Sequence, residues 1–150
     1  MIHLVSEGRI KNKKHYIAFA EDVLNELFPR EFTKREIVIG IKFTTVVNNG
    51  VFGQAGIADD VGNELLVEVA KIVTDPDIRP VSPIEIASTI AHELVHVKQY
   101  IRGELNACMS RWKGQKIPYG PRGALKIPYR RQPWEVEAFE KEVELLELLW

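Results

Sequence analysis

The sequence has little cysteine, little histidine and no long apolar run, and each shortage excludes a class of protein. The single cysteine, Cys108, excludes an intrachain disulfide and favours a reducing compartment. No apolar run approaches the roughly 20 residues that a membrane-spanning helix needs. The first residues also lack the basic and then apolar pattern of a secretory signal. We therefore expect a cytoplasmic protein that does not enter a membrane.

An excess of charge of one sign is also missing. The formal net charge is −1, which predicts no bulk affinity for nucleic acid or for anionic membranes. Hydrophobic residues make up 45% and charged residues 27% of the chain, as in ordinary globular proteins. A chain of 150 residues is long enough for one domain with a buried core. We therefore expect a single domain over residues 1–150.

The first half of the chain predicts a helix followed by a small sheet. Residues 15–28 place apolar side chains at helical spacing. Residues 36–47 alternate between apolar and polar, as a half-buried strand does, and the Asn-Asn-Gly sequence at 48–50 indicates a turn. Residues 51–58 would then run back beside 36–47, and 64–73 would add another strand. The expected sheet is three-stranded and mainly antiparallel.

The second half predicts two helices separated by a long loop. Ser82 and Glu85 form a capping box around a first-turn proline, so a helix begins there and ends near Gly103. Residues 104–133 show no periodicity, and a loop of this length in a compact domain is usually functional. A final helix is expected over 133–150. The predicted fold class is α+β.

The predicted helix 82–103 carries the sequence His92-Glu93-Leu94-Val95-His96. Residues four apart lie one turn apart on one face, so both imidazoles can bind one ion while Glu93 reaches its bound water. The alternative is a pair of core histidines that hydrogen bonds satisfy. Because the pattern lies in mid-helix among apolar residues, it favours a metal site.

A catalytic zinc site takes three protein ligands and one water, so a third ligand is needed. Both remaining histidines lie far upstream, which leaves a carboxylate or Cys108. At about 100° per residue, Glu135 falls beside the apolar stripe of the final helix and Glu137 on its wet side. That stripe consists of Phe139, Val143, Leu146 and Trp150. This placement favours Glu135 as the ligand, although the helix dipole alone also favours a first-turn carboxylate.

Glu142 shares the helix face of Glu135 at the same 100° spacing. A histidine that binds a metal through one ring nitrogen usually donates its other ring N–H to a carboxylate or carbonyl. Glu142 is therefore a candidate acceptor for one of the ligand histidines.

The motif His92–His96, followed by Glu135-Val136-Glu137-Ala138, resembles the zincin metallopeptidases that use glutamate as third ligand, the gluzincins. The resemblance implies a minimal zincin-like domain with Zn²⁺ on His92, His96 and Glu135, and it extends to small bacterial and phage proteins with this motif. It departs at Phe139, where many relatives carry the Asp or Asn that orients a ligand histidine. Peptide deformylase is less similar, because its cysteine ligand precedes the zinc helix.

The resemblance implies a zinc-dependent peptidase acting on protein or peptide substrates, with Glu93 as the general base. The substrate would lie extended along the edge strand 51–58. The charge that develops on the scissile carbonyl oxygen needs a further donor. The loop offers four candidates that the sequence does not rank: Tyr119, Tyr129, Arg130 and Arg131.

The second hypothesis is a non-catalytic, zinc-containing binding module. Residues 98–131 contain nine basic residues and one acidic residue, with aromatic residues between them. Such a loop can contact nucleic acid or an acidic partner. It can also be a solvated loop that the glutamate-rich final helix neutralises. Against the binding module stands Glu93, because a structural zinc site has no use for a carboxylate beside its first ligand.

Overall fold

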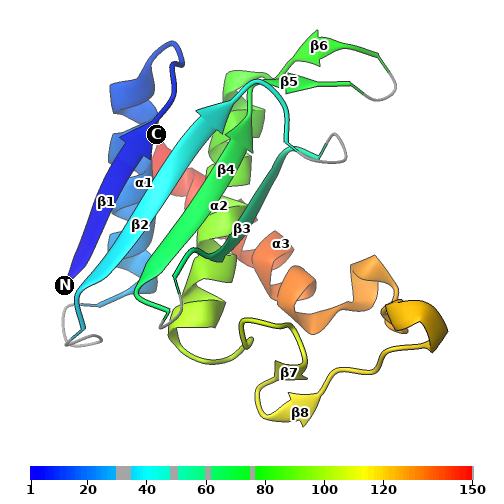
Figure 1. The fold of residues 1–150 in the computed structure, drawn as a ribbon. Coiled ribbons are helices and arrows are strands. Elements are labelled where there is room, and N and C mark those ends of the chain that lie inside the picture. The colour runs from blue at the N-terminus through cyan, green and yellow to red at the C-terminus, as the bar shows by residue number, and fades with distance from the viewer. Residues whose placement is uncertain (30–34, 48–50, 60–61, 75–76, 150) are drawn as a thin grey trace.

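The computed structural model of the chain describes residues 1–29, 35–47, 51–59, 62–74 and 77–149. Within these residues the chain forms three α-helices, a four-stranded mixed sheet and two two-stranded hairpins (Figure 1). The α+β class is therefore confirmed. The expected order of helix, sheet, helix and helix is observed, except that a strand precedes the first helix.

The main sheet is larger than predicted and mostly parallel. Its strands follow the order β1 (Ile2–Glu7), β2 (Ile37–Thr44), β4 (Glu64–Ala70) and β3 (Gly53–Ile57). The β1–β2 and β2–β4 pairs are parallel, and only β3 runs antiparallel to β4. The prediction of a three-stranded, mainly antiparallel sheet was wrong in both number and direction. Strand β1 was missed because only two of its side chains are half-buried. An apolar alternation of that length is too short to recognise in the sequence.

The predicted neighbour of residues 51–58 was also wrong. Strand β3 pairs with β4, and its other edge is open within the described residues. The Asp59 carboxylate closes the connection to β4 by accepting hydrogen bonds from the amides of Gly62, Asn63 and Glu64. The turn predicted at 48–50 lies outside the described residues. Alternation indicates which face of a strand is buried, but it does not indicate the neighbouring strand.

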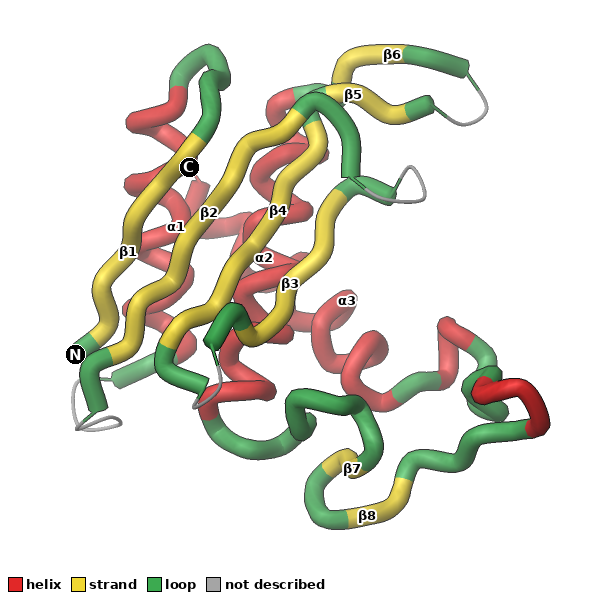
Figure 2. Tube along the Cα trace, viewed as in Figure 1, coloured by secondary structure: helices red, strands yellow, loops and turns green. Residues whose placement is uncertain are grey.

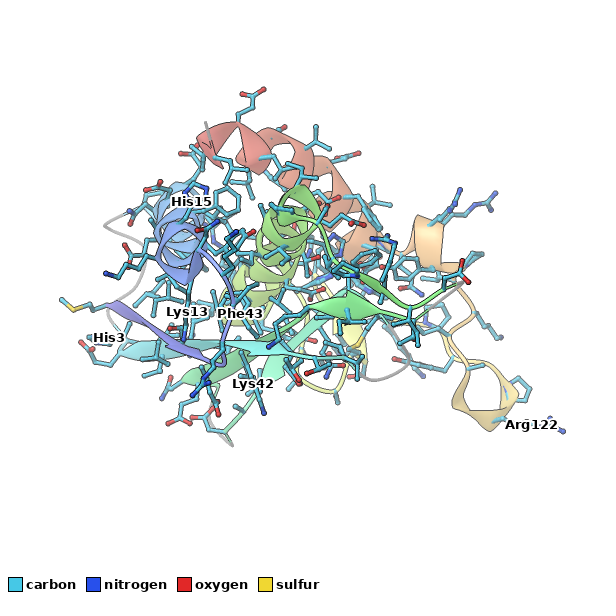
Figure 3. The ribbon with its side chains drawn as sticks, turned by 90° about the horizontal axis from the view of Figure 1, so that it is seen from above. His3, Lys13, His15, Lys42, Phe43 and Arg122 are labelled. Atoms are coloured by element: carbon cyan, nitrogen blue, oxygen red, sulfur yellow. The ribbon has the colours of Figure 1, made fainter. Side chains whose placement is uncertain are left out.

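Helices α1 (Lys13–Leu27) and α2 (Pro83–Ile101) cover one face of the sheet, and α3 lies on the same side (Figure 3). Every second side chain of β2 is buried beneath these helices. Helix α2 begins at the predicted capping box, in which the side chains and amides of Ser82 and Glu85 bond reciprocally. None of the described helices has the length and hydrophobicity required to cross a bilayer.

The chain between α2 and α3 projects from the body of the protein (Figure 2). We call residues 105–131 the basic arm. Two arm residues, Leu105 and Ile117, form a small buried cluster with Trp134. The remaining elements are β5 (Ile72–Val73), β6 (Arg79–Pro80), β7 (Arg111–Trp112), β8 (Gln115–Lys116), the 3-10 helices η2 (Pro121–Gly123), η3 (Tyr129–Arg131) and η4 (Leu146–Leu149), and helix α3 (Pro133–Leu145).

Candidate metal centre

Helices α2 and α3 bring three potential ligand atoms together. His92 Nε2 lies 3.0 Å and His96 Nε2 lies 3.1 Å from the same oxygen, Glu135 Oε1, and the two nitrogens are 3.2 Å apart. Tetrahedral zinc with bonds near 2.05 Å separates its ligands by about 3.3 Å. The three atoms thus form a triangle close to one face of such a tetrahedron. Together these residues can hold a metal ion.

The second ring nitrogen of His92 fixes how this ring faces the triangle. Its Nδ1 lies 2.9 Å from Glu142 Oε2. An ionised carboxylate only accepts hydrogen bonds, so Nδ1 carries a proton, and when the ring is neutral its Nε2 lone pair points at Glu135. The sequence analysis suggested Glu142 as an acceptor for one of the two histidines without choosing between them, and in the structure it lies beside His92. The ring of Phe139 packs against the edge of the same imidazole, with centroids 4.6 Å apart.

A longer network orients His96. Its Nδ1 lies 2.8 Å from Gln99 Oε1. The Gln99 amide nitrogen donates to the Trp134 carbonyl and to the Glu137 carboxylate, each at 2.9 Å, and both of these groups only accept. The oxygen of Gln99 must therefore face His96, whose Nδ1 carries the proton. Gln99 is fully buried, so water cannot replace these bonds.

Two neutral imidazoles held in this way direct two lone pairs at a carboxylate oxygen, an arrangement that requires positive charge. Burial opposes a positive charge on His92, yet hydrogen bonds to Glu135 and Glu142 raise the pKa of His92 to about 9. Burial likewise opposes ionisation of Glu135, but His92 and His96 lower its pKa to about 2. Protons supply the charge in the metal-free chain. A divalent ion could take the place of these protons, because the donors are imidazole nitrogen and carboxylate oxygen, a set that zinc accepts.

Glu93 lies in the same cavity as the triangle and is buried. Burial raises the pKa of its carboxyl group. Strand β3 passes close to it, because a Cβ added at Gly53 would lie 2.5 Å from Thr89 Cγ2 and 3.4 Å from Glu93 Cγ. Glycine at this position therefore allows the edge strand to approach the helix that carries the motif.

The cavity has a volume of about 990 Å³ and is bounded by β3, α2, α3 and the basic arm. Tyr100 and Met109 line it together with the three ligand candidates. Its size is that of sites that bury a bound ligand or a short peptide segment. The open edge of β3 forms one wall, so an extended chain placed in the cavity would lie beside unpaired backbone groups.

Of the four loop residues proposed as donors, only Tyr129 lines the cavity. Its hydroxyl donates to Glu135 Oε1 at 3.1 Å, and burial and that carboxylate raise its pKa, so it stays protonated. Tyr119 instead donates to the Met109 carbonyl at 2.6 Å. Arg130 and Arg131 are exposed, and Arg131 lines a separate groove beside α3. Cys108 is exposed on the basic arm and is not part of the ligand group.

The apolar stripe that was used to rank the glutamates of α3 was placed incorrectly. Phe139 and Val143 are 43% and 67% exposed. The buried face of the helix consists instead of Trp134, Ala138 and Leu145. Glu135 borders this face and still meets the histidines. Glu137, expected on the wet side, is half-buried and accepts from Lys98 at 2.7 Å.

Sequence reasoning missed Gln99 and Tyr100. Gln99 lies three residues after His96, on the same helical face, and this spacing is a signal that could have identified it. Comparison of the chain with models of known families, with curated protein sequences and with solved structures finds no match. A functional assignment therefore rests on the geometry of the site.

Proposed function

We propose that the chain is a zinc-dependent peptidase of the zincin type, with His92, His96 and Glu135 as metal ligands. The observation that carries the proposal is the triangle of ligand atoms, 3.0 to 3.2 Å on each side, in one cavity with Glu93. Zinc bound there supplies a Lewis acid that lowers the pKa of water and polarises a carbonyl oxygen.

Glu93 acts as the general base in this proposal. It takes a proton from the attacking water and passes it to the leaving amine. Two observations support the role: the carboxyl group lines the cavity, and burial raises its pKa towards the range in which a base works near neutral pH. It is not needed as a ligand, because three other side chains already fill that role.

The substrate is held by β3 and oriented by Tyr129. An extended peptide hydrogen-bonds to the open edge of β3, as strand addition requires. The protonated hydroxyl of Tyr129 lies beside Glu135 and donates to the oxygen of the scissile carbonyl as negative charge develops there.

The alternative is a zinc-containing module without catalytic activity. Structural zinc sites are usually closed by four protein ligands. Among the described residues the candidate group has three ligands, and it opens into a cavity of about 990 Å³. An open fourth position and a buried carboxylate beside the first ligand favour the enzyme.

Replacement of Glu93 by glutamine tests the catalytic role. We expect Glu93→Gln to keep the fold and the zinc, because the side chain is not a ligand, and to lower peptide hydrolysis by at least about 100-fold. Hydrolysis is measured by mass spectrometry of fragments from a mixed peptide library incubated with zinc-loaded protein. Glu140→Gln, an exposed change on α3, is the control. Unchanged hydrolysis by Glu93→Gln would exclude Glu93 as the base.

A further inference from the structure

The basic arm carries positive charge that forms few ion pairs with the rest of the described chain. It contains seven basic residues and no acidic one. In the part of the chain that the structure describes, Lys113 is the only arm residue with an ion pair, a 4.0 Å contact with Glu104. The other six basic residues of the arm are exposed: Arg111, Lys116, Arg122, Lys126, Arg130 and Arg131. Among the described residues no glutamate of the final helix forms an ion pair with them, since Glu137 pairs with Lys98 of α2 and Glu144 pairs with Lys141.

The arm leads from the cavity outwards. Met109 and Tyr129 line the cavity, whereas Arg122 lies at the end of the arm, far from the body of the protein (Figure 3). A tight turn in which the Gly120 amide donates to the Ala124 carbonyl forms this end. Arg122 has a φ of 65°, a conformation that costs energy for any residue other than glycine. A charged residue is thus held at the exposed tip despite that cost.

Two of the three aromatic residues of the arm, Trp112 and Tyr129, make ring contacts, and the hydroxyl of the third, Tyr119, donates to the Met109 carbonyl. Trp112 packs against Trp134 with ring centroids 6.1 Å apart, and Lys113 Nζ lies 5.1 Å from its ring centroid. Tyr129 packs edge-on against Phe139 at 6.0 Å. Nucleic acid without sequence preference is bound through aromatic faces on which bases stack. The arm offers seven basic side chains against two partly exposed rings, Tyr119 at 40% and Tyr129 at 54%, and this excess of charge favours an acidic polypeptide over a nucleic acid.

We propose that the basic arm binds an acidic segment of a polypeptide substrate, with the neighbouring peptide bond placed in the cavity. This inference rests on the proposed peptidase function and names its substrate class. Complementary charge on an exposed surface gives recognition and rapid association. The acidic segment occupies the outer arm around Arg122 and Lys126, and the chain continues past Tyr129 to the edge of β3.

Binding is tested by fluorescence anisotropy with a short, dye-labelled oligoglutamate peptide at low ionic strength, in the presence of a chelator. We expect the full chain to bind the peptide, and salt to weaken binding because exposed charges are screened. Arg122→Gln/Lys126→Gln should weaken binding about three- to tenfold. Lys11→Gln/Lys14→Gln removes the same charge from exposed residues beside Lys13, at the opposite end of the molecule, and should leave binding unchanged (Figure 3).

Absence of peptide binding at low ionic strength would overturn the inference, and so would equal weakening by the arm variant and its control. An oligothymidylate of the same charge is the comparison probe. If it binds through the arm more tightly than the peptide does, the partner is a nucleic acid and the inference is wrong.

Failure of the proposed function gives a different result. Because the anisotropy experiment contains no zinc, it does not depend on hydrolysis. With zinc, peptides that carry a run of glutamates far enough from the cleaved bond to reach the outer arm should be hydrolysed with a higher kcat/KM than their glutamine counterparts, and the arm variant should remove this preference. If the peptide binds to the arm but no peptide is hydrolysed, the proposed enzyme fails while the binding surface remains.

Discussion

At the scale of single residues, the orientation of His96 depends on one buried amide. The Gln99 side-chain oxygen accepts a hydrogen bond from Nδ1–H of His96. The Gln99 amide nitrogen donates in turn to the Trp134 carbonyl and to the Glu137 carboxylate. Lys98 also donates to Glu137 and forms an ion pair with Glu104, so the network ends in a cluster of charges. Gln99 is thus a positioning residue that keeps the Nε2 lone pair of His96 directed at the metal position.

Replacing Gln99 by leucine tests this role. Groups that orient a ligand histidine contribute about 10- to 100-fold to metal affinity, and we expect Gln99→Leu to lose that amount. Zinc affinity is measured by competition with a chromophoric chelator, and circular dichroism checks the fold. Gln115→Leu, an exposed change on β8, is the control. A folded Gln99→Leu protein with wild-type affinity would show that His96 needs no such partner.

At the scale of elements, the site depends on the close approach of β3 to α2. Gly53 lies where the strand crosses the helix, and an added Cβ would be 2.5 Å from Thr89 Cγ2 and 2.8 Å from the Glu68 carbonyl oxygen. Gly56 lies three residues further along the same strand, and nothing within 4 Å would meet its Cβ. The two glycines therefore form a matched pair.

We expect Gly53→Ala to lower the free energy of unfolding by about 1–3 kcal/mol, because the added methyl group pushes β3 away from α2. Gly56→Ala should change it by less than about 1 kcal/mol, since the methyl group enters open space. Urea denaturation of the metal-free proteins provides the comparison. Equal destabilisation by both changes would mean that the close packing at Gly53 is not needed.

The sequence allowed prediction of those elements whose signals are local. The capping box at Ser82 and Glu85 indicated the start of α2, and the four-residue spacing of His92 and His96 indicated their common face. The order of the strands could not be predicted in this way. The pairing of β3 with β4 depends on contacts between separate segments, and apolar alternation is the same for either neighbour.

The ligand on α3 shows a second limit of sequence reasoning. Glu135 was favoured from an apolar stripe that includes Phe139, yet Phe139 is 43% exposed. It lies at the rim of the cavity, where its ring covers His92 and Tyr129. Helical periodicity assumes that apolar residues mark the core, and this assumption fails where an apolar side chain lines a site.

At the scale of the whole molecule, two regions of opposite charge flank one cavity. The basic arm forms one wall of the cavity, and α3, which carries exposed glutamates, forms the neighbouring wall. The near-zero net charge hides this division. For the whole protein we propose a zinc site made by His92, His96 and Glu135 in the cavity between β3, α2, α3 and the arm.

The most direct test is the zinc stoichiometry after equilibrium dialysis against micromolar zinc, measured by elemental analysis. The account predicts close to one zinc per chain for the wild-type protein, and for Glu140→Gln as the control. It predicts close to none for Glu135→Ala, because two imidazoles alone bind zinc weakly. Absence of zinc from the wild-type protein, or equal zinc in Glu135→Ala, would contradict it and leave His92 and His96 as buried histidines paired with carboxylates.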